Sequence, residues 1–115
     1  MFDFEKFEVY KKAKIFTKEI SDLLDKLPNR YSRIIDQLTR ASLSIPLNIA
    51  EGAGRYSKAD KRNFYVIARG SAFECVAILD ILLDKKLIDL EQKDHFYRSA
   101  EELSKMTSGL INSQR

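Results

Sequence analysis

The sequence predicts an all-α fold, an antiparallel up-down-up-down four-helix bundle in which residues 1–115 form a single domain. Three observations predict it. Apolar residues make up 44% and charged residues 32% of the chain, a balance typical of amphipathic helices. Only 4 Gly and 2 Pro interrupt the sequence, so the loops must be few and short. Apolar residues recur at steps of three and four in four separate segments, as the core-facing stripe of a helix requires.

The first helix is expected from about Phe4 to Leu27, because its apolar residues follow one stripe with lysines and acids opposite. Pro28 ends this helix, since proline disfavours a helical conformation in the residue before it and has no amide hydrogen to donate. The second helix is predicted to begin near Tyr31. It should end in residues 51–54, Glu-Gly-Ala-Gly, where a glycine can adopt the left-handed cap conformation.

Two capping signals mark the starts of the last two helices. The third helix is predicted from about Lys58 to Lys86, and the fourth begins after Asp89 and continues to about Leu110. Because the joints are short, helices that follow one another in the chain should lie antiparallel. The capping pairs are Ser57 with Asp60 and Asp89 with Gln92.

A proline inside the second helix predicts a kink there. Pro46 leaves the carbonyl of Ser42 without its amide partner, at a cost of ~3 kcal/mol in an unadapted helix. The hydroxyls of Ser42 and Ser44 are candidates to satisfy the freed groups. Folding the second helix back on the third places Ser44 opposite Ala68 and Ser42 opposite Gly70, which predicts a patch of small residues where the two helices approach closely.

The middle of the chain is more apolar than one small bundle can cover. Residues 41–50 place apolar side chains on both faces of the second helix, and Glu74 is the only charge between Gly70 and Leu79 in the third. Helices that are apolar all round are buried on all sides, so a second copy of the chain is the expected cover. The alternative is a monomer that tolerates scattered surface hydrophobes. The side chains expected at the oligomer interface are Leu43, Pro46, Leu47 and Phe73.

Basic residues concentrate around the predicted start of the third helix. Residues 31–62 contain six basic and three acidic side chains, and this surplus accounts for the net charge of +3. The free amides and the dipole at a helix N-terminus also attract anions. This joint is therefore either a nucleic-acid contact or a solvated charged turn. Its basic residues are Arg55, Lys58, Lys61 and Arg62.

A polar cluster is predicted at the end of the apolar stretch. Asn48, Glu51 and Arg55 are three and four residues apart, so they lie on one side of the second helix. They can form one hydrogen-bonded group. Two interpretations stay open: Glu51 and Arg55 clamp the joint to the third helix, or the cluster binds a ligand or partner.

No catalytic, metal or cofactor site is predicted. A di-iron bundle needs two Glu-x-x-His pairs, but His95 is the single histidine and lies in a polar segment. Cys75, in an apolar stretch of the third helix, is expected to pack as a small hydrophobe rather than to react. No histidine base lies near a candidate nucleophile, and no phosphate-binding loop is present. We expect a protein that is not an enzyme and that binds no metal or cofactor.

The sequence favours a cytoplasmic location. The single cysteine has no partner within the chain, and the N-terminal residues lack the apolar core of a signal peptide. The longest run without charge, residues 41–50, is about half of the ~20 residues that a membrane-spanning helix needs. We expect no membrane partner.

The sequence resembles the bacterial "four helix bundle protein" family in residues 44–52, Ser-Ile-Pro-Leu-Asn-Ile-Ala-Glu-Gly, and in Arg55, Ser57, Phe64, Ala68, Gly70, Ser71 and Glu74. That family includes proteins encoded in intervening sequences of 23S ribosomal RNA genes, and it is similar to the accessory variability protein of diversity-generating retroelements. The resemblance covers nearly the whole chain. It implies a homopentameric barrel and, for the retroelement relatives, a basic surface that engages nucleic acid and a reverse transcriptase.

We therefore predict a non-enzymatic homo-oligomer, a pentamer if the resemblance extends to assembly. It is expected to bind RNA or DNA, or a ribonucleoprotein partner, through the basic surface of the second helix and its joint with the third. The alternative is a scaffold that binds protein only. The modest net charge of +3 departs from the strongly basic retroelement relatives, so a reverse transcriptase is not the expected partner.

Overall fold

A computed structural model describes all 115 residues and contains four long helices and no strand. This confirms the all-α four-helix bundle. Its principal extents are 43, 21 and 20 Å, so the helices lie along one long axis. None of them combines the length and the apolar character needed to cross a membrane. The elements are the 3-10 helix η1 Asp3–Lys6, α1 Glu8–Leu24, the 3-10 helix η2 Asn29–Tyr31, α2 Ser32–Ala53, α3 Lys58–Asp84 and α4 Leu90–Ser113.

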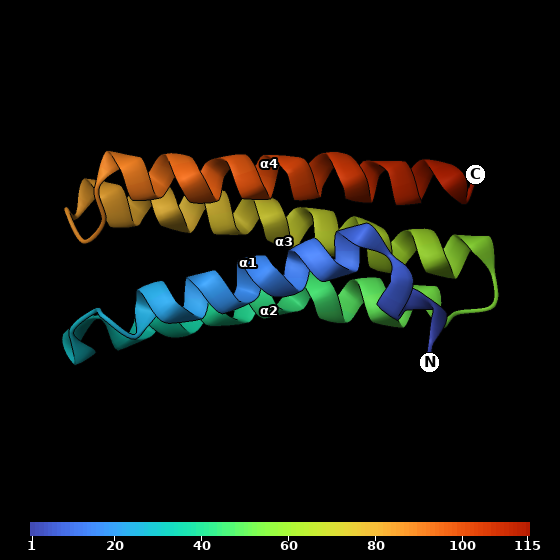
Figure 1. Cartoon of the computed structure of the whole chain (residues 1–115), viewed down its shortest axis with the longest axis horizontal. Helices are drawn as coiled ribbons and strands as arrows, with labels where there is room; N and C mark the ends of the chain where they lie inside the picture. The colour runs from blue at the N-terminus through green and yellow to red at the C-terminus, as the bar shows by residue number, and fades with distance from the viewer.

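The chain turns back at each of its three long-helix joints. Figure 1 shows the α1–α2 and α3–α4 joints at one end of the long axis and the α2–α3 joint at the other, beside both chain termini. Helix α3 contacts α2 and α4, and α1 also contacts α2 and α4. Helices α1 and α3 therefore face each other diagonally across the core.

The core lies along the shared axis of the four helices. Aromatic rings connect α1 and α4, where Phe16 and Phe96 meet edge to face with their centroids 6.1 Å apart. The hydroxyl of the buried Thr107 donates to the carbonyl of Leu103 at 2.9 Å. No buried side-chain nitrogen or oxygen lacks a hydrogen-bond partner, so the interior carries no uncompensated polar group.

The capping signals at the starts of the last two long helices are confirmed. The Ser57 hydroxyl accepts from the Asp60 amide at 3.1 Å, and Asp89 and Gln92 form both bonds of a capping box. The first helix differs from the prediction. Phe7 has an extended backbone, with φ −68° and ψ 127°, and separates η1 from α1.

The helix ends were predicted less well. Gly54 at the end of α2 has φ −84°, so the expected left-handed glycine cap is wrong, and its amide still donates to carbonyls of the preceding turn. The left-handed residue is instead Lys86, with φ 60°, just after α3. There the Lys86 amide donates to the carbonyl of Leu83 at 2.9 Å and the Leu87 amide to that of Leu82 at 3.0 Å. This pair of bonds is a Schellman motif with lysine at the position that usually holds glycine.

Helix α2 continues through Pro46, and α1 supplies the missing hydrogen bond. The hydroxyl of Thr17 lies 3.0 Å from the Ser42 carbonyl, the group that Pro46 deprives of an amide partner, and also contacts the carbonyl of Ala13 at 2.9 Å. The serine hydroxyls expected in this role bond elsewhere, with Ser42 donating to the carbonyl of Thr39. The proline thus makes the α2 backbone depend on a side chain of α1. The kink itself stays a prediction.

Gly52, rather than Gly70, is the glycine at which α2 and α3 are in close contact. A Cβ atom at Gly52 would lie 2.7 Å from the ring of Tyr65, whereas a Cβ atom at Gly70 would meet nothing within 4 Å. The expected pairing is also shifted, because the hydroxyl of Ser44 faces that of Ser71 at 2.8 Å. The hairpin thus pairs Ser44 with Ser71 in place of Ala68. Gly70 is exposed because it lies on the side of α3 away from the core.

We expect Thr17→Val to lower the free energy of unfolding by about 1–2 kcal/mol, because the Ser42 carbonyl then has no donor. In a Pro46→Ala background residue 46 has an amide for this carbonyl, so Thr17→Val should cost less than half as much. Urea unfolding of the four proteins in the cycle measures the difference. Thr39→Val, which removes an exposed hydroxyl, is the matched control. Equal costs of Thr17→Val in both backgrounds would contradict the coupling.

We expect Gly52→Ala to destabilise the bundle by about 1–3 kcal/mol, because the new methyl group overlaps the buried ring of Tyr65. Gly109→Ala is the matched control, since a Cβ atom there meets nothing within 4 Å. The control should raise stability by up to about 1 kcal/mol, as alanine is the better helix former. Thermal unfolding of both variants checks the sign, and a stabilised Gly52→Ala protein would contradict the close contact.

Candidate nucleic-acid interface and self-association surface

The basic residues of the α2–α3 joint gather at one end of the bundle, where α2 ends and α3 begins (Figure 1). Arg55 lies in the joint, with its guanidinium 3.3 Å from the Glu51 carboxylate and 4.5 Å from the ring centroid of Phe64. Lys58 is the first residue of α3, is exposed, and forms no ion pair. These two side chains are the most accessible cations of the joint.

The other two predicted cations bind backbone carbonyls of the same chain. The Lys61 ammonium donates to the carbonyl of Ala53 at 2.8 Å and so caps the C-terminal end of α2. The guanidinium of Arg62 donates to the carbonyl of Gln114, beyond the end of α4. Both side chains are partly buried. A carbonyl does not cancel a full positive charge, so both groups still contribute to the potential at this end.

The structure adds one cation that the sequence analysis did not single out. Arg115 and Arg62 line the same open groove between α3 and α4, together with Asn63 and Ile111. Arg115 is far from the joint in sequence, and only the return of α4 to this end brings it there. No pattern within residues 55–62 indicates that Arg115 lies beside Arg62.

The predicted polar cluster divides into two groups. Glu51 and Arg55 form the expected pair across the joint, at 3.3 Å. Asn48 instead donates to the backbone carbonyl and the hydroxyl of Ser44, at 2.8 and 2.9 Å, and Ser44 contacts Ser71 of α3. The result is a polar seam between α2 and α3, which fixes how the two helices are aligned along the axis.

Three of the four residues predicted at an oligomer interface are on the surface. Leu43, Leu47 and Phe73 are 44%, 55% and 54% exposed. Pro46 is buried and does not belong to this set. Its ring points to the interior because it follows Ser42 by four residues, on the side of α2 that contacts Thr17 of α1.

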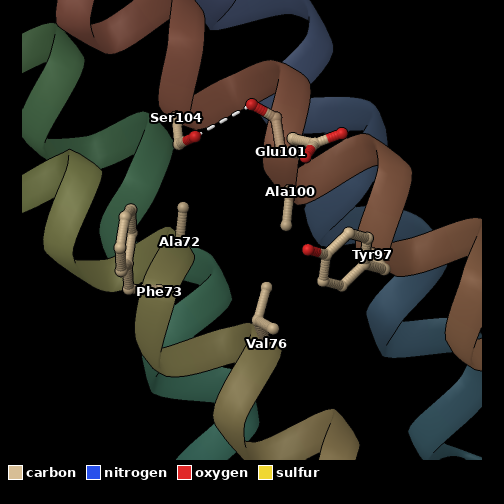
Figure 2. A pocket seen from close by; sticks show the side chains of 7 residues that line it. All are labelled: Ala72, Phe73, Val76, Tyr97, Ala100, Glu101 and Ser104. Carbon is tan, nitrogen blue, oxygen red and sulfur yellow. Dashed lines mark hydrogen bonds between the residues drawn. The ribbon is translucent and has the colours of Figure 1, made fainter.

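An apolar groove lies beside Phe73, between α3 and α4. Figure 2 shows Ala72, Phe73 and Val76 of α3 facing Tyr97 and Ala100 of α4 across it. Its volume is about 200 Å³. Pockets for drug-sized ligands enclose roughly 300–1,000 Å³, so this groove is too small to hold such a ligand.

Cys75 and His95, the two side chains of the types most often used in catalysis, both contact other parts of the bundle. Cys75 is fully buried in the core, as predicted, and burial, followed by the charge of Glu74, raises the pKa of its thiol to about 12. A thiol in this state is not a nucleophile at neutral pH. His95 is exposed, and its ring nitrogen lies 3.2 Å from the carboxylate of Glu19, which connects α4 to α1.

We expect Lys61→Met to lower the free energy of unfolding by about 0.5–1.5 kcal/mol, because the carbonyl of Ala53 loses its donor. Lys58→Met removes the same charge from an exposed side chain without a partner, and it should change stability by less than about 0.5 kcal/mol. Urea unfolding at 25 °C compares the two variants. Equal effects would show that Lys61 has no capping role.

The comparisons with known proteins agree on the family. A crystal structure of a protein of unknown function from the S23 ribosomal protein family of Bacteroides thetaiotaomicron superposes with a TM-score of 0.82 and 27% sequence identity, over 90% of this chain and 97% of that one. No curated protein matches the sequence at a significant level. The family model of the 23S rRNA-intervening sequence protein matches residues 5–109. This match confirms the resemblance seen in the sequence, and the chain belongs to the family of 23S rRNA-intervening sequence proteins.

Proposed function

We propose that this protein is a non-enzymatic homo-oligomer, a pentamer by the family resemblance, that binds RNA through the basic end of its bundle. The observation that carries the proposal is the charge of the α2–α3 joint, where four basic residues and one acidic residue lie between positions 55 and 62. The residues proposed to contact phosphate are Arg55, Lys58, Lys61 and Arg62.

The geometry of the joint supports phosphate binding in two ways. Lys58 is the exposed first residue of α3, at the helix end whose free amides favour anions. Lys61 and Arg62 pair with carbonyls rather than carboxylates, so their charges are not neutralised within the chain. Only Arg55 has a carboxylate partner, and that ion pair is exposed and worth little.

Self-association would strengthen binding at this end. One subunit offers few phosphate contacts, but several copies that present the same end multiply them. Exposed apolar side chains on α2 and α3, with Leu47 55% and Phe73 54% exposed, support the oligomer. The buried free thiol of Cys75 fits a reducing compartment, and we propose a cytoplasmic location.

A second candidate is a scaffold that binds only protein. The observation that favours it is the engagement of Lys61 and Arg62 in backbone caps, which leaves only Arg55 and Lys58 freely exposed. Apolar protein contacts respond weakly to salt, whereas phosphate contacts release counterions and weaken steeply as salt rises. The salt dependence of binding therefore separates the two functions.

We expect fluorescence anisotropy to detect binding of mixed-sequence single-stranded RNA at low salt, with affinity that falls as salt rises. Each phosphate contact contributes roughly −0.7 to the slope of log affinity against log salt on single strands. Lys58→Gln should flatten this slope by about 0.7 for every copy in contact with the RNA. Lys58 is the informative residue because its loss does not disturb a cap.

Lys85→Gln is the matched control, since Lys85 is exposed at the opposite end of α3 and its removal changes the net charge equally. Its slope should equal that of the wild type. Duplex DNA of the same length tests whether the site distinguishes RNA from DNA. A wild-type protein that fails to bind either nucleic acid at low salt would leave protein scaffolding as the function.

A further inference from the structure

Tyr56, in the joint between α2 and α3, is the most exposed large apolar side chain of the protein. Its relative exposure of 103% means that the ring covers nothing in the bundle and adds no buried apolar area to the fold. A single exposed apolar side chain is common and needs no explanation by itself. Tyr56 differs from the ordinary case because its ring is aromatic, has two free faces and is flanked by cations.

The other exposed aromatic rings have partners within the chain. The rings of Phe73 and Tyr97 each lie beside a cation, whose charge is 4.7 and 5.8 Å from the ring centroid. The ring of Phe2 stacks on a second phenylalanine with the centroids 5.9 Å apart. No such contact involves Tyr56. Its ring is therefore the one exposed aromatic surface that is free to contact another molecule on both faces.

Two accessible cations flank this ring in the sequence. Arg55 directly precedes Tyr56, and Lys58 follows it by two residues. The guanidinium of Arg55 is held 4.5 Å from the ring centroid of Phe64, and Lys58 is exposed and forms no ion pair. Residues 55–62 contain four basic residues and one acidic residue. The surroundings of Tyr56 are therefore complementary to a chain of negative charges.

The backbone on both sides of Tyr56 is fixed by hydrogen bonds. Before it, the Arg55 amide donates to the carbonyl of Gly52 at 3.2 Å, which continues the last turn of α2. After it, the hydroxyl of Ser57 accepts from the Asp60 amide at 3.1 Å and caps α3. The joint thus presents the ring from an ordered backbone, so little backbone entropy is lost when a ligand contacts it.

The joint lies at one end of the long axis of the bundle, as Figure 1 shows. Copies that associate along the sides of their helices leave this end uncovered, so a ligand can reach Tyr56 in a monomer and in an oligomer. Proteins that bind single-stranded nucleic acid combine cations along the phosphate backbone with aromatic side chains on which the bases stack. A free ring between cations is this combination in its smallest form.

We propose that Tyr56 stacks on an unpaired base of single-stranded RNA while Arg55 and Lys58 contact neighbouring phosphates of the same strand. This inference rests on the RNA binding proposed above and adds the form of RNA that the site recognises. In a duplex the bases stack on one another inside the helix, so Tyr56 has no base face to contact. Every base has such a face, so the site distinguishes unpaired from paired RNA and has little preference for sequence.

Fluorescence anisotropy on a mixed-sequence single-stranded RNA, and on the same sequence as a duplex, tests the stacking. Tyr56→Ala should weaken binding of the single strand at least about fivefold, the lower end of what one base stacked on an aromatic ring contributes. It should leave the affinity for the duplex unchanged. Because Tyr56→Ala removes no charge, the slope of log affinity against log salt should equal that of the wild type.

Two further variants serve as controls. Tyr56→Phe keeps the ring, so its affinity for the single strand should stay within about twofold of the wild type. Tyr97→Ala removes an exposed tyrosine from α4, outside the joint, and should bind both RNAs as the wild type does. Circular dichroism and sedimentation velocity verify that each variant keeps the helical fold and the association state of the wild type.

The outcomes separate this inference from the function on which it rests. A wild-type protein that binds no RNA at low salt removes both. A wild-type protein that binds RNA with a salt-dependent affinity, while Tyr56→Ala binds the single strand equally well, removes the stacking and leaves the phosphate contacts. Equal losses on single strand and duplex, or a loss in Tyr97→Ala as large as that in Tyr56→Ala, also overturn the stacking.

Discussion

Helix α3 is the element that organises the bundle, because one apolar side packs against both α2 and α4 while a second apolar side faces solvent. One side contains Ala68, Cys75 and Leu79, all fully buried against neighbouring helices, and it organises the core. The other side faces solvent with Val66, Phe73 and Ile81. No arrangement of the remaining three helices can cover both, since α1 lies diagonally opposite. The bundle must therefore either leave an apolar surface exposed or share it with another molecule.

The sequence predicted most of the fold because periodicity and capping are local. The three-four spacing located the four long helices, and the hydroxyl of Ser57 caps α3 as its position indicated. The errors concern properties that depend on tertiary contacts. Gly54 needs no left-handed conformation, because its amide already bonds within the preceding turn. Pro46 is tolerated inside α2 because Thr17, distant in sequence, donates to the carbonyl that the proline leaves without an amide partner. No local pattern predicts that hydrogen bond.

In the candidate site, the sequence likewise did not predict which distant groups the long polar side chains contact. Their positions along the chain placed Arg55, Lys58, Lys61 and Arg62 at one end of the bundle, but not the direction in which each side chain points. Lys61 and Arg62 extend back to carbonyls that the ends of α2 and α4 leave unpaired. Asn48 likewise turns from its predicted partners to Ser44 in the seam between helices. A basic cluster in a sequence thus overstates the number of free cations when helix ends lie nearby.

The seam between α2 and α3 also has a consequence for how the bundle forms. Ser44 and Ser71 are 27 residues apart in sequence, whereas Lys12 and Glu102, which connect α1 to α4, are 90 apart. Closing the longer loop costs about 1 kcal/mol more in chain entropy. The exposed ion pair recovers little of this, so the α1–α4 edge depends on the buried contact between Phe16 and Phe96. The central hairpin is thus the part whose ends cost less chain entropy to bring together from the unfolded chain.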